Sequence, residues 1–240
     1  MNDEIRMTND ERSFRLASFP LRYSSFGFRH FLQGLMTMAG DAKPADRFML
    51  WVDAVGGYWV CLADELIIGQ PGDRGGADIP ILADISARHA RIRRDGEGYL
   101  IDAFREVRVG GRPVETTELL TDGSRIEIGR GVKLQMRRAH PLSCTARLDF
   151  LSRHRTQPPA DAVLLLADSC VLGPKPQSHI VCRDWAREVI LFRHDEKLYC
   201  HAAGRFEIDG VTCKNRGQLQ ANSRVSGEGF SFSLEPVEKL

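Results

Sequence analysis

The stretch Leu66–Tyr99 decides the fold, and it reads L-I-I-G-Q-P-G-D-R-G-G-A-D-I-P-I-L-A-D-I-S-A-R-H-A-R-I-R-R-D-G-E-G-Y. A short apolar run ends in Gly69 and is followed by a loop rich in glycine. A second apolar run leads to Ser86, Arg88 and His89, just before a new strand pattern and a D-G turn signal. Short strands that alternate with polar loops in this way predict a site built from loops.

The same residues resemble the signature of the forkhead-associated (FHA) domain, a β-sandwich family that reads phosphothreonine peptides. That signature pairs glycine-arginine after one strand with S-R-x-H before another. Gly69, Ser86 and His89 match it. Gln70 stands in place of the first arginine, and Ala87 stands in place of the second, with an arginine one position later. The resemblance therefore implies the FHA fold, with a changed set of ligand positions.

The wider pattern predicts an all-β protein. Many short apolar runs are separated by turn signals such as G-G and D-G, and no long helical period interrupts them. Between residues 47 and 138 we expect strands near 48–54, 58–62, 65–69, 79–83, 88–94, 98–103, 107–109, 112–114, 125–128 and 132–137. Beyond a short polar connection at 138–145, further strands are expected near 146–152, 162–167, 188–193 and 230–234.

An internal repeat organises the chain. A shift of 99 positions places Ala87-Arg88 on Ala186-Arg187 and S-R-I at 124–126 on S-R-V at 223–225. Upstream, the second copy aligns if it has lost five residues from the glycine-rich loop. The sequence thus predicts two tandem FHA-like β-sandwiches, at 47–138 and 145–240, the second of them degenerate. Because the connection is short, we expect the pair to act as a rigid unit.

Residues 1–46 differ in kind from the rest and form an N-terminal extension. Apolar residues at helical spacing within 26–40 favour one amphipathic helix, and the first twenty residues are expected to be disordered. This segment lacks the pattern of a secretory signal, and no run approaches the length of a membrane span. We therefore expect a cytoplasmic protein without a membrane partner.

Composition excludes several classes of function. The chain has 240 residues and a formal net charge of +1, which gives no global field for nucleic acid. Any anion site must be local. Six cysteines at 61, 144, 170, 182, 200 and 213 are too few for a disulfide scaffold and are interpreted as core thiols.

The candidate phosphopeptide site centres on Ser86 and Arg88. In an extended segment two residues apart, both side chains point the same way, so a hydroxyl and a guanidinium can converge on one phosphate. Candidate further donors are Gln70, Arg74 and Arg105, together with backbone amides of the glycine-rich loop. The alternative is structural: Ser86 caps a turn, Arg88 pairs with a nearby aspartate, and the glycines only permit a long loop.

Three residues are expected to support this site. The resemblance implies that His89 braces the site loops through hydrogen bonds, that Gly69 belongs to the loop framework and that Gly111 lies in a later turn. The family also carries an asparagine that grips the peptide backbone, and here the stretch D-A-F-R-E-V-R-V-G-G has none.

In the second copy the signature is lost. Pro174 replaces the arginine after the glycine, Trp185 stands where Ser86 was, and Glu188 stands where His89 was. We expect the indole to fill the phosphate position and the carboxylate to repel an anion, so this copy is predicted to bind no phosphopeptide.

Other constellations are weaker. His179, Cys182, Cys200, His201 and Cys213 are of zinc-ligand type, but no C-x-x-C pair accompanies them, and no metal or other cofactor is predicted. The glycine-rich loop lacks the Gly-Lys-Ser/Thr of a nucleotide loop. No catalytic residues are assigned, because no nucleophile–base order stands out.

The sequence therefore predicts a non-catalytic protein-interaction module in signalling, whose first copy binds phosphothreonine peptides. The alternative is a structural scaffold or oligomerisation protein whose FHA folds have lost that binding. A protein or phosphopeptide partner is expected, and a homo-oligomer stays open.

Overall fold

The structure is a computed structural model that describes residues 47–72, 76–96 and 98–237. The N-terminal extension at 1–46, its expected helix at 26–40, and Arg74 lie outside the described residues. Within the described part the regular elements are all β-strands, so the all-β prediction is confirmed. No helix there is long and apolar enough to cross a membrane.

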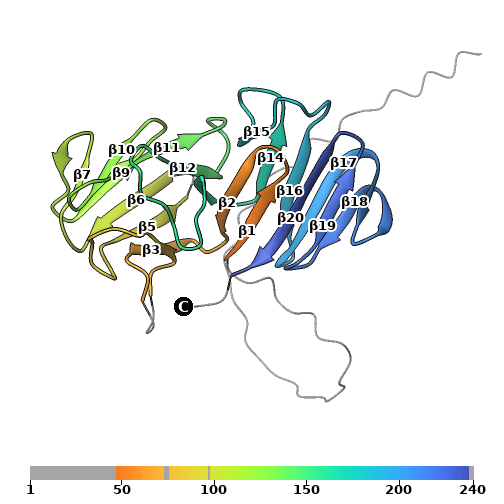
Figure 1. The fold of residues 1–240 in the computed structure, drawn as a ribbon. Helices are drawn as coiled ribbons and strands as arrows, with labels where there is room; N and C mark the ends of the chain where they lie inside the picture. Colours follow the sequence, from red (N-terminus) through yellow and green to blue (C-terminus); the bar gives the residue numbers. More distant parts are fainter. Residues whose placement is uncertain (1–46, 73–75, 97, 238–240) are drawn as a thin grey trace, which may run out of the picture. The chain divides into compact units, whose positions relative to one another are not determined.

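The first copy contributes eleven of the described strands (Figure 1). They are β1 (Arg47–Val52), β2 (Gly56–Cys61), β3 (Glu65–Gly69), β4 (Ile79–Pro80), β5 (Ala90–Asp95), β6 (Gly98–Ala103), β7 (Val107–Val109), β8 (Arg112–Pro113), β9 (Thr117–Leu120), β10 (Arg125–Ile128) and β11 (Val132–Arg138). Tight turns join several of them, and glycines with positive φ lie at the turns before β8 and β11.

The second copy contributes the nine strands that follow. They are β12 (Ala146–Phe150), β13 (Ala162–Leu165), β14 (Ser169–Gly173), β15 (Ile180–Val181), β16 (Val189–His194), β17 (Lys197–Ile208), β18 (Val211–Leu219), β19 (Arg224–Gly227) and β20 (Phe230–Pro236).

Strand pairing repeats at the spacing that the sequence shows. Ala90 pairs with Ala103 between β5 and β6, and Val189 pairs with Ala202 between β16 and β17. In the same way Ile126–Val109 of β10 and β7 corresponds to Val225–Ile208 of β19 and β17. Both correspondences keep an offset of 99. The repeat is therefore present in the pairing as well as in the sequence.

The five missing residues are not all in the glycine-rich loop, which corrects that part of the alignment. The paired residues Ile68 and Ile79 are eleven positions apart, whereas their counterparts Leu172 and Ile180 are eight apart. The other two missing residues come from the loop between β4 and β5, which is shorter in its counterpart between β15 and β16. Both loops that build the candidate site are thus reduced in the second copy.

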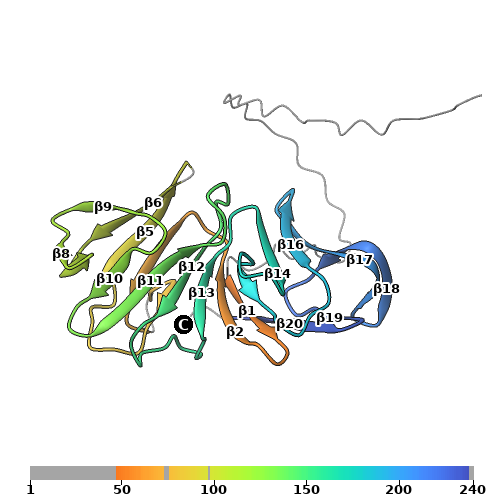
Figure 2. The same cartoon turned by 90° about the horizontal axis from the view of Figure 1, so that it is seen from above.

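The first strand of each copy pairs with the last strand of the other copy. β1 pairs with β20, and β12 pairs with β11, both antiparallel. The second strands, β2 and β13, pair with each other in parallel. The two copies are consequently joined in one sheet, whereas β4, β3, β5, β6 and β9 form a separate sheet of the first copy. Figure 2 shows β1, β2 and β13 in the middle of the described structure.

The hydrophobic cores follow this exchange. Phe48 and Leu50 of β1 belong to the core formed with β14–β20, while Met49 between them belongs to the core formed with β3–β11. Likewise, Leu164 of β13 faces the second core and Val163 faces the first. The strands β1, β2 and β13 are therefore buried on both faces, as successive side chains of a strand point to opposite sides.

The described residues form one compact unit. The division into domains at 47–138 and 145–240 stays a prediction. Strand pairing and both cores cross that division, because β12 follows the connection at 139–145 and packs in the first core through Ala146 and Leu148.

Candidate functional site

The loop after β3 and the loop before β5 meet at one end of the first copy. The backbone N–H of Gln70 donates to the carbonyl of Ser86 at 3.1 Å. At Gly69 an added Cβ would lie 1.9 Å from the carbonyl oxygen of Ala87, so only glycine fits where the two backbones cross. This close approach fixes Ser86 beside the end of β3.

His89 ties three loops together. Its Nδ1 accepts the backbone N–H of Ser86 at 3.2 Å, so its Nε2 carries the proton and donates to the carbonyl of Glu106 at 2.9 Å. That carbonyl also accepts the N–H of Gly129, in the turn between β10 and β11. The imidazole is 5% exposed, and both ring nitrogens have partners, so His89 holds the loops in place and is not free for proton transfer.

Ser86 and Arg88 are the free groups of this site. The Ser86 side chain is partly buried, and its hydroxyl makes no hydrogen bond with a described residue. Arg88 is exposed and makes neither a hydrogen bond nor an ion pair with the described residues, so the alternative pairing with Asp84 is not seen. A hydroxyl and a guanidinium two positions apart are both left available for an anion.

The other predicted donors contribute unequally. The side-chain amide of Gln70 donates to the carbonyl of Ala83 at 3.2 Å, which holds the site loop from within. Arg105 is exposed, and among the described residues its guanidinium hydrogen-bonds only to the neighbouring carbonyl of Phe104, at 3.3 Å. Gly111 lies in the exposed turn between β7 and β8 with φ of +80°.

In the second copy the residues aligned with Ser86 and His89, Trp185 and Glu188, make different contacts. Trp185 is 6% exposed and packs in the second core, its ring 5.5 Å from that of Phe230. The expectation that this indole fills the phosphate position is therefore wrong, because an apolar side chain of this size is turned into the core. Glu188 instead pairs with Lys175 at 2.9 Å and crowds Gly173.

The second copy also lacks the third loop of the site. In the first copy residues 104–106 separate β6 from β7, and they carry Arg105 and the carbonyl that receives His89. In the second copy the equivalent segment is part of the continuous strand β17, which pairs with β18 along its length except at a bulge between His201 and Arg205. With two loops shortened and one absent, the geometry of the first site is not repeated.

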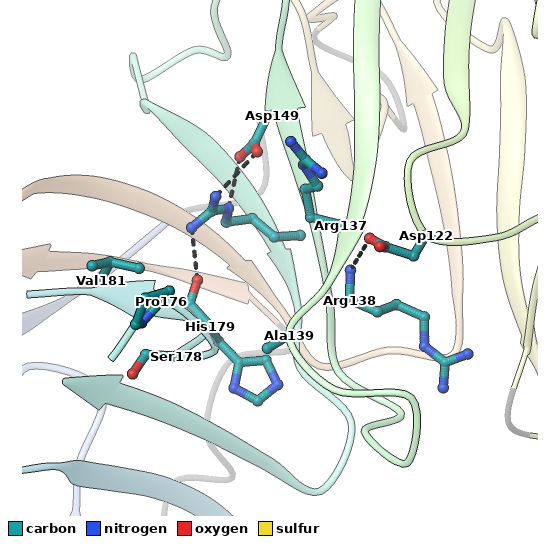
Figure 3. A pocket seen from close by; sticks show the side chains of 10 residues that line it. Asp122, Arg137, Arg138, Ala139, Asp149, Pro176, Ser178, His179 and Val181 are labelled. Carbon is teal, nitrogen blue, oxygen red and sulfur yellow. Dashed lines mark hydrogen bonds and ion pairs between the residues drawn. The ribbon is translucent and has the colours of Figure 1, made fainter. Parts of the chain in front are cut away.

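A cavity of about 340 Å³ lies where the copies meet, between β11, β12 and the loop before β15 (Figure 3). All three guanidinium nitrogens of Arg147 have partners. Two of them donate to Asp149, at 2.6 and 3.1 Å, and the third donates to the carbonyl of His179 at 2.7 Å. Among the arginines of this cavity, Arg137 alone lacks a partner within the described residues.

The imidazole of His179 is also fully engaged. Its Nδ1 accepts the N–H of Val171 at 3.0 Å, and its Nε2 donates to the hydroxyl of Ser143 at 2.8 Å. Burial, assisted by the nearby Arg147 charge, lowers the pKa of His179 to about 4. The ring is neutral near pH 7, and its hydrogen bonds join the connection at 139–145 to β14.

Of the zinc-type residues, His179, Cys182 and Cys200 are buried, whereas His201 is exposed and Cys213 is partly exposed. Cys182 and Cys200 are buried free thiols, and burial raises the pKa of each to about 12. Across the described ranges, no three or more histidine, cysteine or acidic side chains are grouped in a way that could hold a metal ion.

One neighbour of the site was not predicted from the sequence. The loop between β12 and β13, at 151–161, lies against the loop between β4 and β5: the N–H of Leu82 donates to the carbonyl of Arg155 at 3.0 Å, and Ile81 forms a bridge with Thr156. The sequence shows a basic stretch here, R-H-R at 153–155, but nothing in it places that stretch beside the first copy.

Comparisons with known proteins give no match to a family model and none to a curated protein. Among solved structures, matches are found to FHA domains. One, from a study of phosphothreonine-dependent FHA domain interactions, is 29% identical, covers 35% of this chain and 88% of its own, and has a TM-score of 0.25. An FHA domain from Chlamydia trachomatis is 27% identical over 35% of this chain and 89% of its own, with a TM-score of 0.26.

A further match is Mycobacterium tuberculosis EmbR in complex with a low-affinity phosphopeptide, 29% identical over 35% of this chain and 22% of its own, with a TM-score of 0.27. Each of these likenesses extends over about a third of this chain. The first copy is called FHA-like because of the arrangement of Gly69, Ser86 and His89.

Proposed function

We propose that this protein is a non-catalytic interaction module in signalling whose first copy binds phosphothreonine-containing peptides. The observation that carries the proposal is the pair Ser86 and Arg88, whose side chains have no partners among the described residues and lie where three loops are braced by His89. A phosphate is the ligand that such a hydroxyl and guanidinium suit best. Arg105, exposed on the third loop, is a further donor for the same anion.

The FHA structures that this chain resembles support the choice of ligand class, since those studies concern phosphothreonine-dependent interactions and a bound phosphopeptide. The departures at Gln70 and Ala87 mean that Arg88 has to supply the contact that the family's arginines make. Binding is accordingly expected to depend strongly on this one residue.

The test is a titration of the full chain with a phosphothreonine peptide library and with the same peptides unphosphorylated. We expect phosphate-dependent binding that Arg88→Ala weakens about 10- to 100-fold, because one charge-assisted arginine–phosphate contact contributes roughly 1.5–3 kcal/mol. Arg187→Ala, at the aligned position of the second copy, is the control and should leave the affinity unchanged. Equal binding of both peptide forms, or none, would refute the proposal.

A structural role is the second candidate, favoured by the second copy. There the positions equivalent to the site are occupied by Trp185 in the core and by the Glu188–Lys175 ion pair, while the strands lock the two copies together. In this case the full chain would bind no phosphopeptide and would act as a scaffold for other proteins or for its own copies. The titration above separates the two candidates.

A further inference from the structure

The loop at 151–161 belongs to the second copy in sequence but borders the candidate site of the first copy in space. On one side it holds the loop between β4 and β5: besides the Leu82–Arg155 hydrogen bond, the N–H of Gln157 donates to the carbonyl of Pro80 at 3.0 Å. On the other side it holds the start of β11, where the N–H of Lys133 donates to the hydroxyl of Ser152 at 3.2 Å. Figures 1 and 2 both show the β12–β13 connection at this end of the first copy.

The turn between β10 and β11 lies between this loop and the candidate site. An added Cβ at Gly131 would lie 3.6 Å from His154, and one at Gly129 would lie 3.0 Å from Ile85 and 3.3 Å from His89. The turn between β10 and β11 therefore touches the 151–161 loop through one glycine and the core of the candidate site through another. The 151–161 loop and the candidate site are thus linked through this turn, and a peptide held at Ser86 that crosses the turn would meet the loop.

The arginines of this surface lack acidic partners. Arg130 and Arg153 are exposed and, like Arg88, make no hydrogen bond or ion pair with the described residues. Arg155 is exposed too; its guanidinium contacts carbonyls of its own loop and lies 5.6 Å from the ring centre of Phe150. These groups form what we call the basic rim, defined as Arg130, Arg153 and Arg155.

The arginines on strand β5 of the same copy, in contrast, form ion pairs. Arg91 and Arg93 both contact Asp102, at 2.8 and 3.2 Å, and Arg94 contacts Asp64 at 2.7 Å. Arginine on the β5 surface is thus neutralised within the fold, whereas arginine on the basic rim is not. Two exposed acids lie close in sequence to the site, Asp84 and Glu106. Glu106 pairs with Arg108 at 3.5 Å, and neither acid has an ion pair with the rim among the described residues.

We infer that the basic rim is a second recognition surface, which selects phosphothreonine peptides carrying acidic residues to one side of the phosphate. Guanidinium groups bind aspartate and glutamate carboxylates through paired hydrogen bonds. The inference rests on the proposed function, because the rim selects among peptides that the Ser86 site already holds. It also gives the strand exchange a role: the second copy supplies part of the binding surface of the first.

The experiment compares three peptides on the full chain: a phosphothreonine peptide with aspartate and glutamate on both sides, the same peptide with asparagine and glutamine instead, and the acidic peptide without phosphate. We expect the acidic phosphopeptide to bind about three- to tenfold more tightly than the neutral one at low salt, and the difference to shrink as salt rises. In the triple variant Arg130→Gln, Arg153→Gln, Arg155→Gln the two phosphopeptides should bind equally, at the wild-type affinity for the neutral one.

The matched control is Arg112→Gln, which removes the same charge from an exposed arginine on β8, outside the loops of the site. It should keep the preference. The inference is wrong if the wild-type chain binds phosphopeptides but does not distinguish the acidic from the neutral one. It is also wrong if Arg112→Gln removes the preference as completely as the rim variant does. In both cases the proposed function stands. If neither phosphopeptide binds, the proposed function itself fails.

Discussion

Gly69 is the residue on which the geometry of the candidate site depends most. The backbones of the β3 end and of the loop before β5 cross there, and an added methyl group would meet the carbonyl of Ala87 at 1.9 Å. A carbonyl of the backbone cannot move aside as the end of a flexible side chain can. The glycine of the signature is therefore required by steric contact, independently of its φ angle.

The first prediction is that Gly69→Ala destabilises the protein by about 1–3 kcal/mol, the usual cost of forcing atoms into a packed site. Gly72→Ala is the control, because an added Cβ there has nothing within 4 Å. The free energy of unfolding from urea titration measures both. Equal stability of the two variants would show that the crossing at Gly69 is looser than described here.

At this scale the sequence predicted which residues meet and that His89 braces the loops through hydrogen bonds, but not the contacts of Gln70 and Trp185. The spacing of Gly69, Ser86 and His89 placed the two loops together, because the signature encodes strand ends that face each other. The internal hydrogen bond of Gln70 and the burial of Trp185 were not predictable, since both depend on the path of loops whose length differs between the copies. An aligned position does not imply an aligned side-chain direction.

Between elements, the connection at 139–145 is fastened to β14 by the imidazole of His179 and by Thr145, whose hydroxyl donates to the carbonyl of Ser169 at 2.7 Å. His179 accepts from Val171 and donates to Ser143, and its low pKa shows that the fold favours the neutral ring. Protonation would turn the accepting Nδ1 into a donor that faces another N–H. This junction is therefore sensitive to acid.

The second prediction concerns stability against pH. In the unfolded chain a histidine titrates near 6.5, and in the folded chain His179 titrates near 4, so the unfolded state binds the extra proton first as pH falls. The contribution of His179 to stability is complete above pH 6.5 and is lost progressively between pH 6.5 and 4, by about 3 kcal/mol at most. His179→Gln should flatten that part of the stability profile. An unchanged profile would mean that the pKa of His179 is the same in the folded and the unfolded chain.

Most strands were predicted from the sequence, but β9, β14, β15, β17, β18 and β19 were not. The alternation of apolar and polar residues predicted β5, β6 and β10 almost to the residue. The strand β9, Thr117–Leu120, was missed because its first three residues are exposed, so it shows no buried alternation. Backbone pairing with β6 holds it at the edge of its sheet. The long β17–β18 hairpin was missed because the chain bulges at Gly204, where φ is +90°, without leaving the sheet.

Over the whole molecule, the strand exchange is the feature that the sequence did not predict. Hydrophobic periodicity tells which face of a strand is buried, but it does not tell which distant strand is the partner. One signal was present: F-M-L-W-V at 48–52, Y-W-V-C-L at 58–62 and A-V-L-L-L-A at 162–167 are continuous apolar runs. Such runs are typical of strands buried on both faces, and here they are the strands shared by the two cores.

The central claim is that the two copies form one cooperative unit in which the second completes the site of the first. The most direct measurement is urea unfolding of the full chain, followed by hydrogen exchange of the backbone amides. The protection of the β5–β6 segment and that of the β16–β17 segment are followed separately. The variants are Ile92→Ala in the first core and Leu191→Ala in the second, each expected to cost about 2–5 kcal/mol because both side chains are buried. We predict that both copies lose protection at one urea concentration and that either substitution lowers the midpoint of both. If each substitution moves only the midpoint of its own copy, the copies are independent and the claim is contradicted.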